Sequence, residues 1–416
     1  MKTMAPSRLW TGALVFMVPA LCLTTGPGIG LASFLLLLTA LWMPRAGRAA
    51  LSRHWRDVRW VVFAFLFNFL LVLLYFALRP EQPMSSLEKP LRMLCAVSAM
   101  VAVLVARPPR QALWWGAIVG AAGAMCFVGW QRIVLGMERP GGMINAITFG
   151  DIALTMGMVA LAAAIDFRRA RLPALWPTLW PLLGGLAGIL ALVMTGTRGG
   201  WIALGLAALL CMRLAHLGSN RNVRLLIGAG AALAAVLYFV PATEVRLRVQ
   251  QGIDDVRRWE SGEYKFTNMG IRLELWKGAG MLIAQHPLVG QDPATAHAQV
   301  VRWVKDGTLS DVALAPQHLH NDVLQALASG GVLGLLALIG ILAAPFAFFA
   351  RQAKLAALRG QPASAPALAG MLVALGYFAY GLTEMMFWSG KACIFYALMI
   401  FILMGLCLNQ KEEFGN

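Results

Sequence analysis

Long apolar runs recur along almost the whole chain and are separated by short segments rich in arginine, proline and glycine. A helix that crosses a bilayer needs about 20 consecutive, mainly apolar residues. We therefore predict an all-α polytopic membrane protein with about twelve transmembrane helices and one large loop that contains helices. The predicted spans are 9–25, 28–43, 60–78, 91–106, 112–135, 148–165, 175–195, 199–215, 224–241, 321–350, 366–386 and 391–408.

The composition agrees with this interpretation. Of the 416 residues, 59% are hydrophobic and only 13% are charged, whereas soluble domains carry about 25% charged residues. The first 25 residues resemble a signal peptide, but a second apolar run follows directly and no small-residue cleavage site is evident, so we predict that they form the first span. The six cysteines all lie in apolar runs and form no CxxC pair, which argues against a disulfide framework or a zinc site.

Basic residues are distributed unevenly between the two sets of connections. Nineteen of the 35 lysines and arginines fall on the side that also receives both termini, and seven fall in the short loops of the other side. By the positive-inside rule, the first side is cytoplasmic. The net charge of +16 is thus a signal of topology and of attraction to anionic membrane lipids, and it is no evidence for nucleic-acid binding.

One connection, residues 242–320, is much longer than the others and faces the periplasm in this topology. Within it, 268–284 is predicted to form an amphipathic helix that ends at His286-Pro287. Loops of this length in compact proteins are usually functional. We therefore divide the chain into nine spans over 1–241, the large periplasmic loop over 242–320 and three spans over 321–416.

The densest group of potentially catalytic side chains stands where this loop meets the tenth span. Histidine has the unperturbed pKa nearest neutrality, so His320 is a candidate general base, with His318 and Asn321 as supporting residues. On a continuous helix, Gly331 and Gly334 would share a face with His320 and let a neighbouring helix approach closely. The alternative is an interfacial histidine beside glycines that serve packing alone.

Two arginines on the predicted periplasmic side are candidates for binding phosphate. Arg198 lies in a glycine-rich connection between two spans, where its charge opposes the positive-inside rule. A guanidinium can bind phosphate through two parallel hydrogen bonds, although a lipid-headgroup contact is the alternative. Arg272, on the predicted loop helix, is either a second phosphate ligand or a salt-bridged surface residue.

Three further charges, Arg139, Asp151 and Glu384, lie at predicted outer ends of spans. Charges at such positions are usually functional, but their spacing assigns them no role. A metal site built from His318, His320 and nearby acidic residues is a competing chemistry, and no spacing such as HExxH supports it. We predict neither a metal nor a cofactor.

Three motifs resemble those of the bacterial O-antigen ligase family. His320-Asn321, nine residues, Gly331, two residues and Gly334 is similar to its His-[Asn/Ser/Gln]-x9-Gly-x2-[Gly/Thr/Tyr] signature. The segment Thr195–Gly200 resembles its Thr-Gly-[Ser/Thr]-Arg-Gly segment. Arg272 with Trp276, followed by 286–290, resembles its Arg-x3-[Leu/Trp] helix and His-Pro-Leu-x-Gly turn, although position 276 is Trp where Leu is usual. The resemblance covers roughly 195–335.

The resemblance implies a membrane-embedded glycosyltransferase of the GT-C type, with a GT-C-like fold, in the Gram-negative inner membrane. Its donor would be a glycan on undecaprenyl pyrophosphate and its acceptor a sugar hydroxyl of lipid A–core, joined on the periplasmic face. His320 would be the base, while Arg198 and Arg272 would bind the leaving pyrophosphate. A polymerase of the same superfamily remains an alternative, and so does a secondary transporter, although transporters usually place ionisable groups near the bilayer midplane. The glycan, the acceptor hydroxyl and the oligomeric state are left open.

Overall fold

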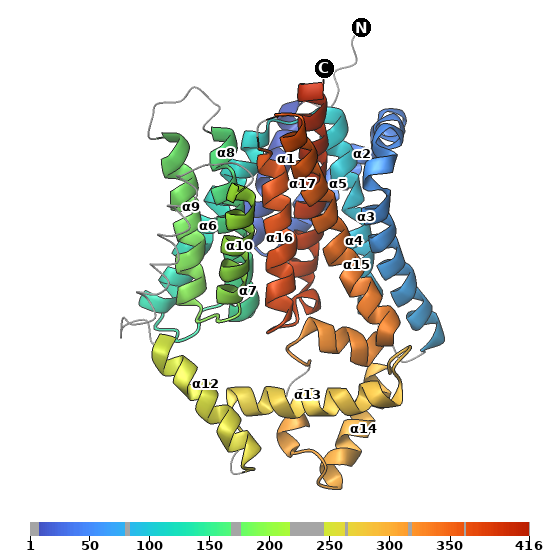
Figure 1. Cartoon of the computed structure of the whole chain (residues 1–416), viewed down its shortest axis with the longest axis vertical. Helices are drawn as coiled ribbons and strands as arrows, with labels where there is room; N and C mark the ends of the chain where they lie inside the picture. Colours follow the sequence, from blue (N-terminus) through green and yellow to red (C-terminus); the bar gives the residue numbers. More distant parts are fainter. Residues whose placement is uncertain are drawn as a thin grey trace. The chain divides into compact units, whose positions relative to one another are not determined.

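The structure is a computed structural model that describes residues 8–79, 84–167, 176–216, 245–262, 265–314, 318–361 and 363–415. Every regular element in these ranges is a helix, which confirms the all-α prediction (Figure 1). The chain divides into two compact units, one made of Met1–Ala203 and Leu336–Asn416 and the other of Leu204–Leu335. The second unit extends beyond the predicted loop 242–320 at both ends.

Apolar helices make up the first unit. They are α1 (Arg8–Cys22), α2 (Gly28–Leu41), α3 (Pro44–Leu78), α4 (Ser85–Cys95), α5 (Val97–Ala106), α6 (Arg110–Ile133), α7 (Ala146–Ala162), α8 (Ala164–Phe167), α9 (Trp176–Met194), α16 (Ala365–Gly381), the short 3-10 helix η3 (Met386–Trp388) and α17 (Gly390–Gly415). Two more helices, α10 (Gly200–His216) and α15 (Asp322–Leu358), have residues in both units.

Six helical segments of the described chain are long and apolar enough to cross a membrane, so the chain is a membrane protein. They are Pro44–Leu78, Ser85–Ala106, Arg110–Ile133, Ala146–Phe167, Asp322–Leu358 and Gly390–Glu413. Predicted spans outside these six fall on shorter apolar helices, except for 224–241, which lies outside the described residues. Twelve membrane crossings therefore stay a prediction.

One predicted connection has a different structure. The basic segment 44–59 is the first part of α3, which begins at Pro44 and continues without interruption to Leu78. Proline suits the first turn of a helix, and arginine is a good helix former, so the polar segment extends the helix beyond its apolar run.

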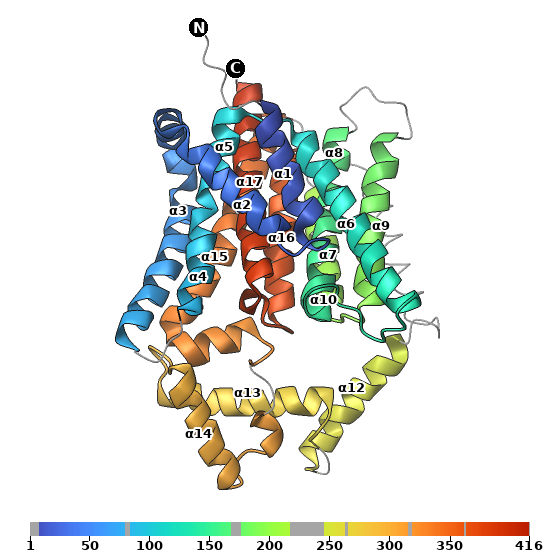
Figure 2. The ribbon, with the colours of Figure 1, turned by 180° about the vertical axis from the view of Figure 1, so that it is seen from behind.

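Helix α17 forms the centre of the first unit, and both views of the ribbon show it surrounded by other helices (Figures 1 and 2). The stretch 392–404 is buried at every position, and α1, α2, α4, α5 and α16 pack against this helix. A helix that is apolar on all sides must be kept from water, here by the surrounding helices. Its aromatic side chains Phe395, Tyr396 and Phe401 are fully buried.

Small residues allow close contacts between the backbones of the first unit. A Cβ atom on Gly188 of α9 would lie 2.7 Å from the carbonyl oxygen of Ala153 and 2.9 Å from Cα of Gly157, both on α7. A Cβ atom on Gly120 of α6 would lie 2.4 Å from the carbonyl oxygen of Pro19 on α1. Such contacts stabilise helix association where lipid provides little hydrophobic driving force between helices.

The second unit contains the polar helices α12 (Val245–Glu260), α13 (Asn268–Gln285) and α14 (Pro293–Lys305), the 3-10 helix η2 (Asp311–Leu314) and the first turns of α15. Helix α13 confirms the predicted loop helix and has Thr267 as its N-cap. Leu282, Trp303, Leu309 and Ala313 form a small apolar core between α13, α14 and η2.

The Glu274 carboxylate holds three segments of this unit together. It is fully buried, and it accepts hydrogen bonds from Nε1 of Trp259 at 2.9 Å and from the backbone N–H of Ser310 at 2.7 Å. The ammonium group of Lys265 lies 3.5 Å away. Burial raises the pKa of the Glu274 carboxyl, but these hydrogen bonds and nearby lysines outweigh burial, so its pKa is below the usual value.

We predict that Glu274→Gln destabilises the second unit by roughly 1–3 kcal/mol, because an amide has one acceptor oxygen for two buried donors. Since the folded-state pKa is lowered, the carboxylate contributes stability above the unfolded-state pKa of about 4.3 and loses it as pH falls through the folded-state value. Thermal unfolding of the full chain between pH 3 and pH 7 should show a smaller pH dependence for the variant. Equal stability and equal pH dependence of the two proteins would contradict this role.

Candidate functional site

Helix α15 is interrupted at Gly331, in the middle of the sequence that follows His320. Gly331 has φ 60° and ψ −155°, a conformation outside the helical region that only glycine adopts readily. The segments before and after it are helical. The break thus separates the short helical segment 322–330 from the longer apolar segment that follows.

The turn after α13 fills this break. Val332 donates its N–H to the carbonyl of Pro287 at 2.8 Å, where an intact helix would use the carbonyl of Ala328. The carbonyl of Ala328 instead accepts the N–H of Gln291 at 2.9 Å. Backbone hydrogen bonds lost inside α15 are therefore replaced by bonds to 287–291, and the buried polar groups keep partners.

Gly290 and Gly331 make this contact sterically possible. A Cβ atom on Gly331 would lie 2.2 Å from the carbonyl carbon of Leu288, and one on Gly290 would lie 2.5 Å from the backbone nitrogen of Gly330. Gly290 also has a positive φ of 63°. The contact between the turn and the broken helix therefore requires glycine at both positions, Gly290 in the turn after α13 and Gly331 in the motif that begins at His320.

This geometry corrects the common helical face expected for His320, Gly331 and Gly334. The helix begins at Asp322, after His320, and it is broken at Gly331. The segment that approaches Gly331 closely is the turn at Leu288, not a neighbouring helix, and the atom nearest to a Cβ on Gly334 is the carbonyl oxygen of Ala326 in the same element. A period of 3.6 residues cannot be extended across a glycine that leaves the helical conformation.

The backbone on both sides of His320 is held by side chains. Asn321 is the N-cap of α15, and its Oδ1 accepts the N–H groups of Val323 and Leu324 at 2.9 and 3.0 Å. Before His320, the carbonyl of Leu319 accepts Nε1–H of Trp276 at 2.9 Å. His320 itself has a φ of 50°, in the left-handed region, where histidine is more common than most other residues. Its half-buried imidazole is thus presented from a fixed backbone.

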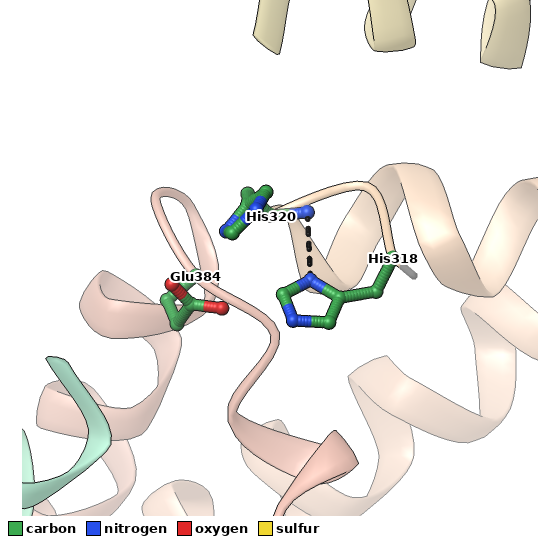
Figure 3. A group of neighbouring side chains, drawn as sticks. All are labelled: His318, His320 and Glu384. Carbon is green, nitrogen blue, oxygen red and sulfur yellow. Dashed lines mark hydrogen bonds between the residues drawn. The ribbon is translucent and has the colours of Figure 1, made fainter. Parts of the chain in front are cut away.

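The two histidines of this segment lie side by side, with ring centroids 4.3 Å apart and the planes inclined by 61°. Nδ1 of His318 accepts the backbone N–H of His320 at 3.4 Å, a long hydrogen bond shown as a dashed line in Figure 3. His318 thereby contacts the backbone at His320.

Arg272 belongs to α13 and lies one turn before Trp276. Residues four positions apart lie on the same face of a helix. Trp276 bonds to Leu319, so Arg272 is on the helix face that is directed toward the His318–His320 segment. Trp276 stands where the family resemblance has leucine as the usual residue, and its indole nitrogen supplies a hydrogen bond that leucine lacks.

In the first unit, Arg198 lies in the short connection between α9 and α10. Two buried threonines anchor this connection: the hydroxyls of Thr195 and Thr197 are 2.8 Å apart, and Thr197 also donates to the carbonyl of Ala146 at 3.2 Å. Gly196 has a φ of 68°, and a Cβ on Gly199 would overlap with Oγ1 of Thr383. Arg198 is exposed between these buried residues, so its side chain is presented by a closely packed loop.

Arg132 connects this loop to the one that carries Arg139. Its Nη1 donates to the carbonyl of Glu138 at 2.9 Å and to that of Met194 at 3.3 Å. Arg139 is exposed in the loop between α6 and α7, next to Glu138. The two candidate arginines of this unit, Arg139 and Arg198, therefore lie on loops joined at the same end of the helices.

Two buried carboxyl groups lie close to the Arg198 loop. Asp151 on α7 is fully buried, and neither of its carboxylate oxygens has a hydrogen-bond partner among the described residues. It interacts electrostatically with Glu384, which is 2% exposed and follows Thr383, the residue that contacts Gly199. Asp151, Glu384 and the Arg198 loop thus occupy one region of the first unit.

Several residues that hold these groups are absent from the candidates chosen by sequence. Trp276, Arg132 and the threonine pair of the Arg198 loop act through hydrogen bonds to backbone carbonyls or to each other. The N-cap role of Asn321 has a clear sequence signal, since asparagine directly before an apolar helical run is typical of a helix start. The partner of Trp276 has no such signal, because Leu319 lies 43 residues away.

The described part of the chain is thus helical, and its candidate histidine and arginines stand on segments held by specific hydrogen bonds. Residues 183–339 match the family model described as O-antigen ligase. This match supports membership of the O-antigen ligase family, whose members are glycosyltransferase-like enzymes of O-antigen processing. The match contains Arg198, Arg272, His320 and the broken part of α15.

The chain is also similar to an uncharacterized protein of Haemophilus influenzae. The two sequences are 21% identical over 293 residues, which cover 70% of this chain and 73% of the relative.

We predict that Gly331→Ala destabilises the protein by several kcal/mol, since a Cβ would overlap with the backbone of Leu288 and the φ of 60° is strained for alanine. A matched control is Gly280→Ala: Gly280 lies in helix α13, and a Cβ there meets nothing within 4 Å. The control should be neutral or slightly stabilising, because alanine favours a helix by up to about 1 kcal/mol. Thermal unfolding of the two variants measures this difference in stability. Similar stabilities of the two variants would contradict the tight contact between Gly331 and the turn at Leu288.

Proposed function

We propose that the protein is an O-antigen ligase. It transfers O-antigen polysaccharide from undecaprenyl pyrophosphate to a sugar hydroxyl of lipid A–core, on the periplasmic face of the Gram-negative inner membrane, with both termini in the cytoplasm. The observation that supports this most is the strained, hydrogen-bonded backbone that presents the imidazole of His320 within the family-matched segment. Strain of this kind is found preferentially at functional sites.

In this proposal His320 is the general base. The acceptor hydroxyl is a poor nucleophile, and a group with a pKa near neutrality is suited to remove its proton during attack. The oxygen of the acceptor forms a bond to the anomeric carbon while the bond from that carbon to the pyrophosphate oxygen breaks. A single displacement inverts the configuration, and undecaprenyl pyrophosphate leaves as the anion.

Arg198 and Arg272 are proposed to stabilise the negative charge that develops on the leaving pyrophosphate. Fixed positive groups aimed at developing charge give one of the largest contributions to catalysis. The exposed position of Arg198 on a loop anchored by Thr195 and Thr197 supports this role, because the guanidinium is placed by a rigid backbone. Arg139 and Asp151 are proposed as supporting residues.

The main alternative is a polymerase of the same superfamily, which would join repeat units to each other. A transporter is a less favoured alternative, because the candidate residues belong to a matched segment of an enzyme family.

His320→Ala distinguishes the ligase from the polymerase. In the bacterium that carries the gene, the variant should reach the membrane at normal abundance and produce lipopolysaccharide without polymer, while full-length polymer accumulates on the lipid carrier. His318→Ala should keep measurable transfer, because His318 acts on the backbone N–H of His320 and leaves the imidazole of the base in place. Lipopolysaccharide capped with single repeat units would identify a polymerase instead, and an active His320→Ala would refute the base.

Arg198→Lys should lower the transfer rate about 100-fold or more, although it keeps the charge, because an ammonium group lacks the planar pair of donors that matches pyrophosphate. Arg92→Lys is the control: Arg92 is half-exposed and pairs locally with Glu88. The control should have the rate of the wild type in a purified assay with lipid-linked donor. A wild-type rate for Arg198→Lys would exclude a bidentate contact.

We also expect transfer to continue after metal removal. Guanidinium groups provide the positive charge in the proposed mechanism, so enzyme treated with EDTA should have the rate of untreated enzyme. Imidazoles are also metal ligands, and the rings of His318 and His320 lie close together. A rate abolished by EDTA and restored by a divalent cation would therefore shift the mechanism to a metal bound by these histidines.

A further inference from the structure

A polar pocket lies in the first unit. The end of α15, the segment that leads into α16 and the end of α17 surround it. Its polar lining consists of Gln352, Arg359, Gln361, Ser364, Gln410 and Lys411. Among the described residues that line it, none is acidic.

Gln352 supplies a buried donor that lacks an acceptor. The residue is only 5% exposed, and its Nε2 has no hydrogen-bond partner among the described residues. A buried amide N–H without an acceptor costs about 1–3 kcal/mol, so such groups usually have a partner. Gln410 also lines the pocket, and its Oε1 accepts the hydroxyl of Ser364 at 2.7 Å. The pocket therefore offers Gln352 a site for an external acceptor.

The two charged side chains that line the pocket are both positive. Arg359 and Lys411 line it, and Asp57, which pairs with Lys411 at 2.8 Å, is also paired with Arg351 at 3.8 Å. Ser364 is the N-cap of α16, and the N-terminal end of a helix favours negative charge. An external acceptor in this pocket is therefore expected to be an anion.

The position of the pocket favours an anion that belongs to a lipid. It lies at the ends of two helices that are apolar enough to cross a membrane, α15 and α17. Leu358, next to Arg359, is 73% exposed and provides an apolar surface for an acyl chain. The same end of α17 carries Glu412, which pairs with Arg53 and Arg107. Basic residues at helix ends are typical of the cytoplasmic leaflet, where anionic lipids are recognised by basic pockets.

We propose that this pocket binds the phosphate of an anionic phospholipid headgroup. Arg359 and Lys411 provide the charge, and Nε2 of Gln352 donates a hydrogen bond to a phosphate oxygen. A free phosphate ion could form the same polar contacts, but it has no acyl chain to pack against the exposed Leu358.

The test uses the delipidated full chain in detergent. Bound lipid is counted by native mass spectrometry, and thermal unfolding is followed during titration with phosphatidylglycerol, phosphatidylcholine or inorganic phosphate. Arg359→Ala should weaken phosphatidylglycerol binding about fivefold, the loss expected for one basic contact near a membrane surface. Gln352→Leu, which removes the buried donor, should weaken it as well. Lys354→Ala is the matched control, because Lys354 is an exposed basic residue of α15 that does not line the pocket.

Selective retention of phosphatidylglycerol that is weakened by both pocket variants and unchanged in the control would support the proposal. Equal weakening by Lys354→Ala would overturn it in favour of general surface electrostatics. Stabilisation by inorganic phosphate at the same concentrations would overturn the lipid in favour of a soluble anion. Absence of binding by all three additives would mean that the pocket holds water only.

Discussion

The arrangement of the second unit depends on an exchange of backbone hydrogen bonds at Gly331. A helix broken inside a protein leaves N–H and C=O groups that must find new partners. Here the turn at 287–291 supplies them, with Val332 bonded to Pro287 and Gln291 bonded to Ala328. The contact joins the end of α13 to the beginning of α15. Arg272 lies on α13, and Asn321, the residue after His320, is the N-cap of α15. The same contact therefore fixes two groups of the candidate site.

The candidate functional groups share a physical design. His320 is half-buried and Arg198 is exposed, and each stands on a segment whose neighbours are held by specific bonds. Asn321 and Trp276 hold the backbone around His320, and the paired hydroxyls of Thr195 and Thr197 hold the loop of Arg198. A precise position is what transfer chemistry requires, because small displacements of catalytic groups cost large factors in rate. Loops without such bonds would present the same side chains less accurately.

Buried polar groups of the first unit separate into those with a structural partner and those without one. Trp114 donates to Asp166 at 3.0 Å and Tyr396 donates to the carbonyl of Ile341 at 2.6 Å, so both groups complete the packing between helices. The carboxylate of Asp151 and the amide nitrogen of Gln352 lack such partners among the described residues. Since an unpaired buried polar group is costly, a role beyond packing is expected at these two positions.

The sequence by itself determined the helical class, the positions of most apolar helices, helix α13 and the choice of His320, Arg198 and Arg272 as candidates. These features depend on local patterns: apolar runs, capping residues and residue types with particular chemistry. The tertiary structure alone decided that Gly331 breaks α15, that the turn at Leu288 fills the break, and that Trp276 holds the carbonyl of Leu319. A glycine permits a break but does not require one, and partners 43 residues apart are chosen by packing. Local sequence patterns therefore predict neither the break of α15 at Gly331 nor the hydrogen bond between Trp276 and Leu319.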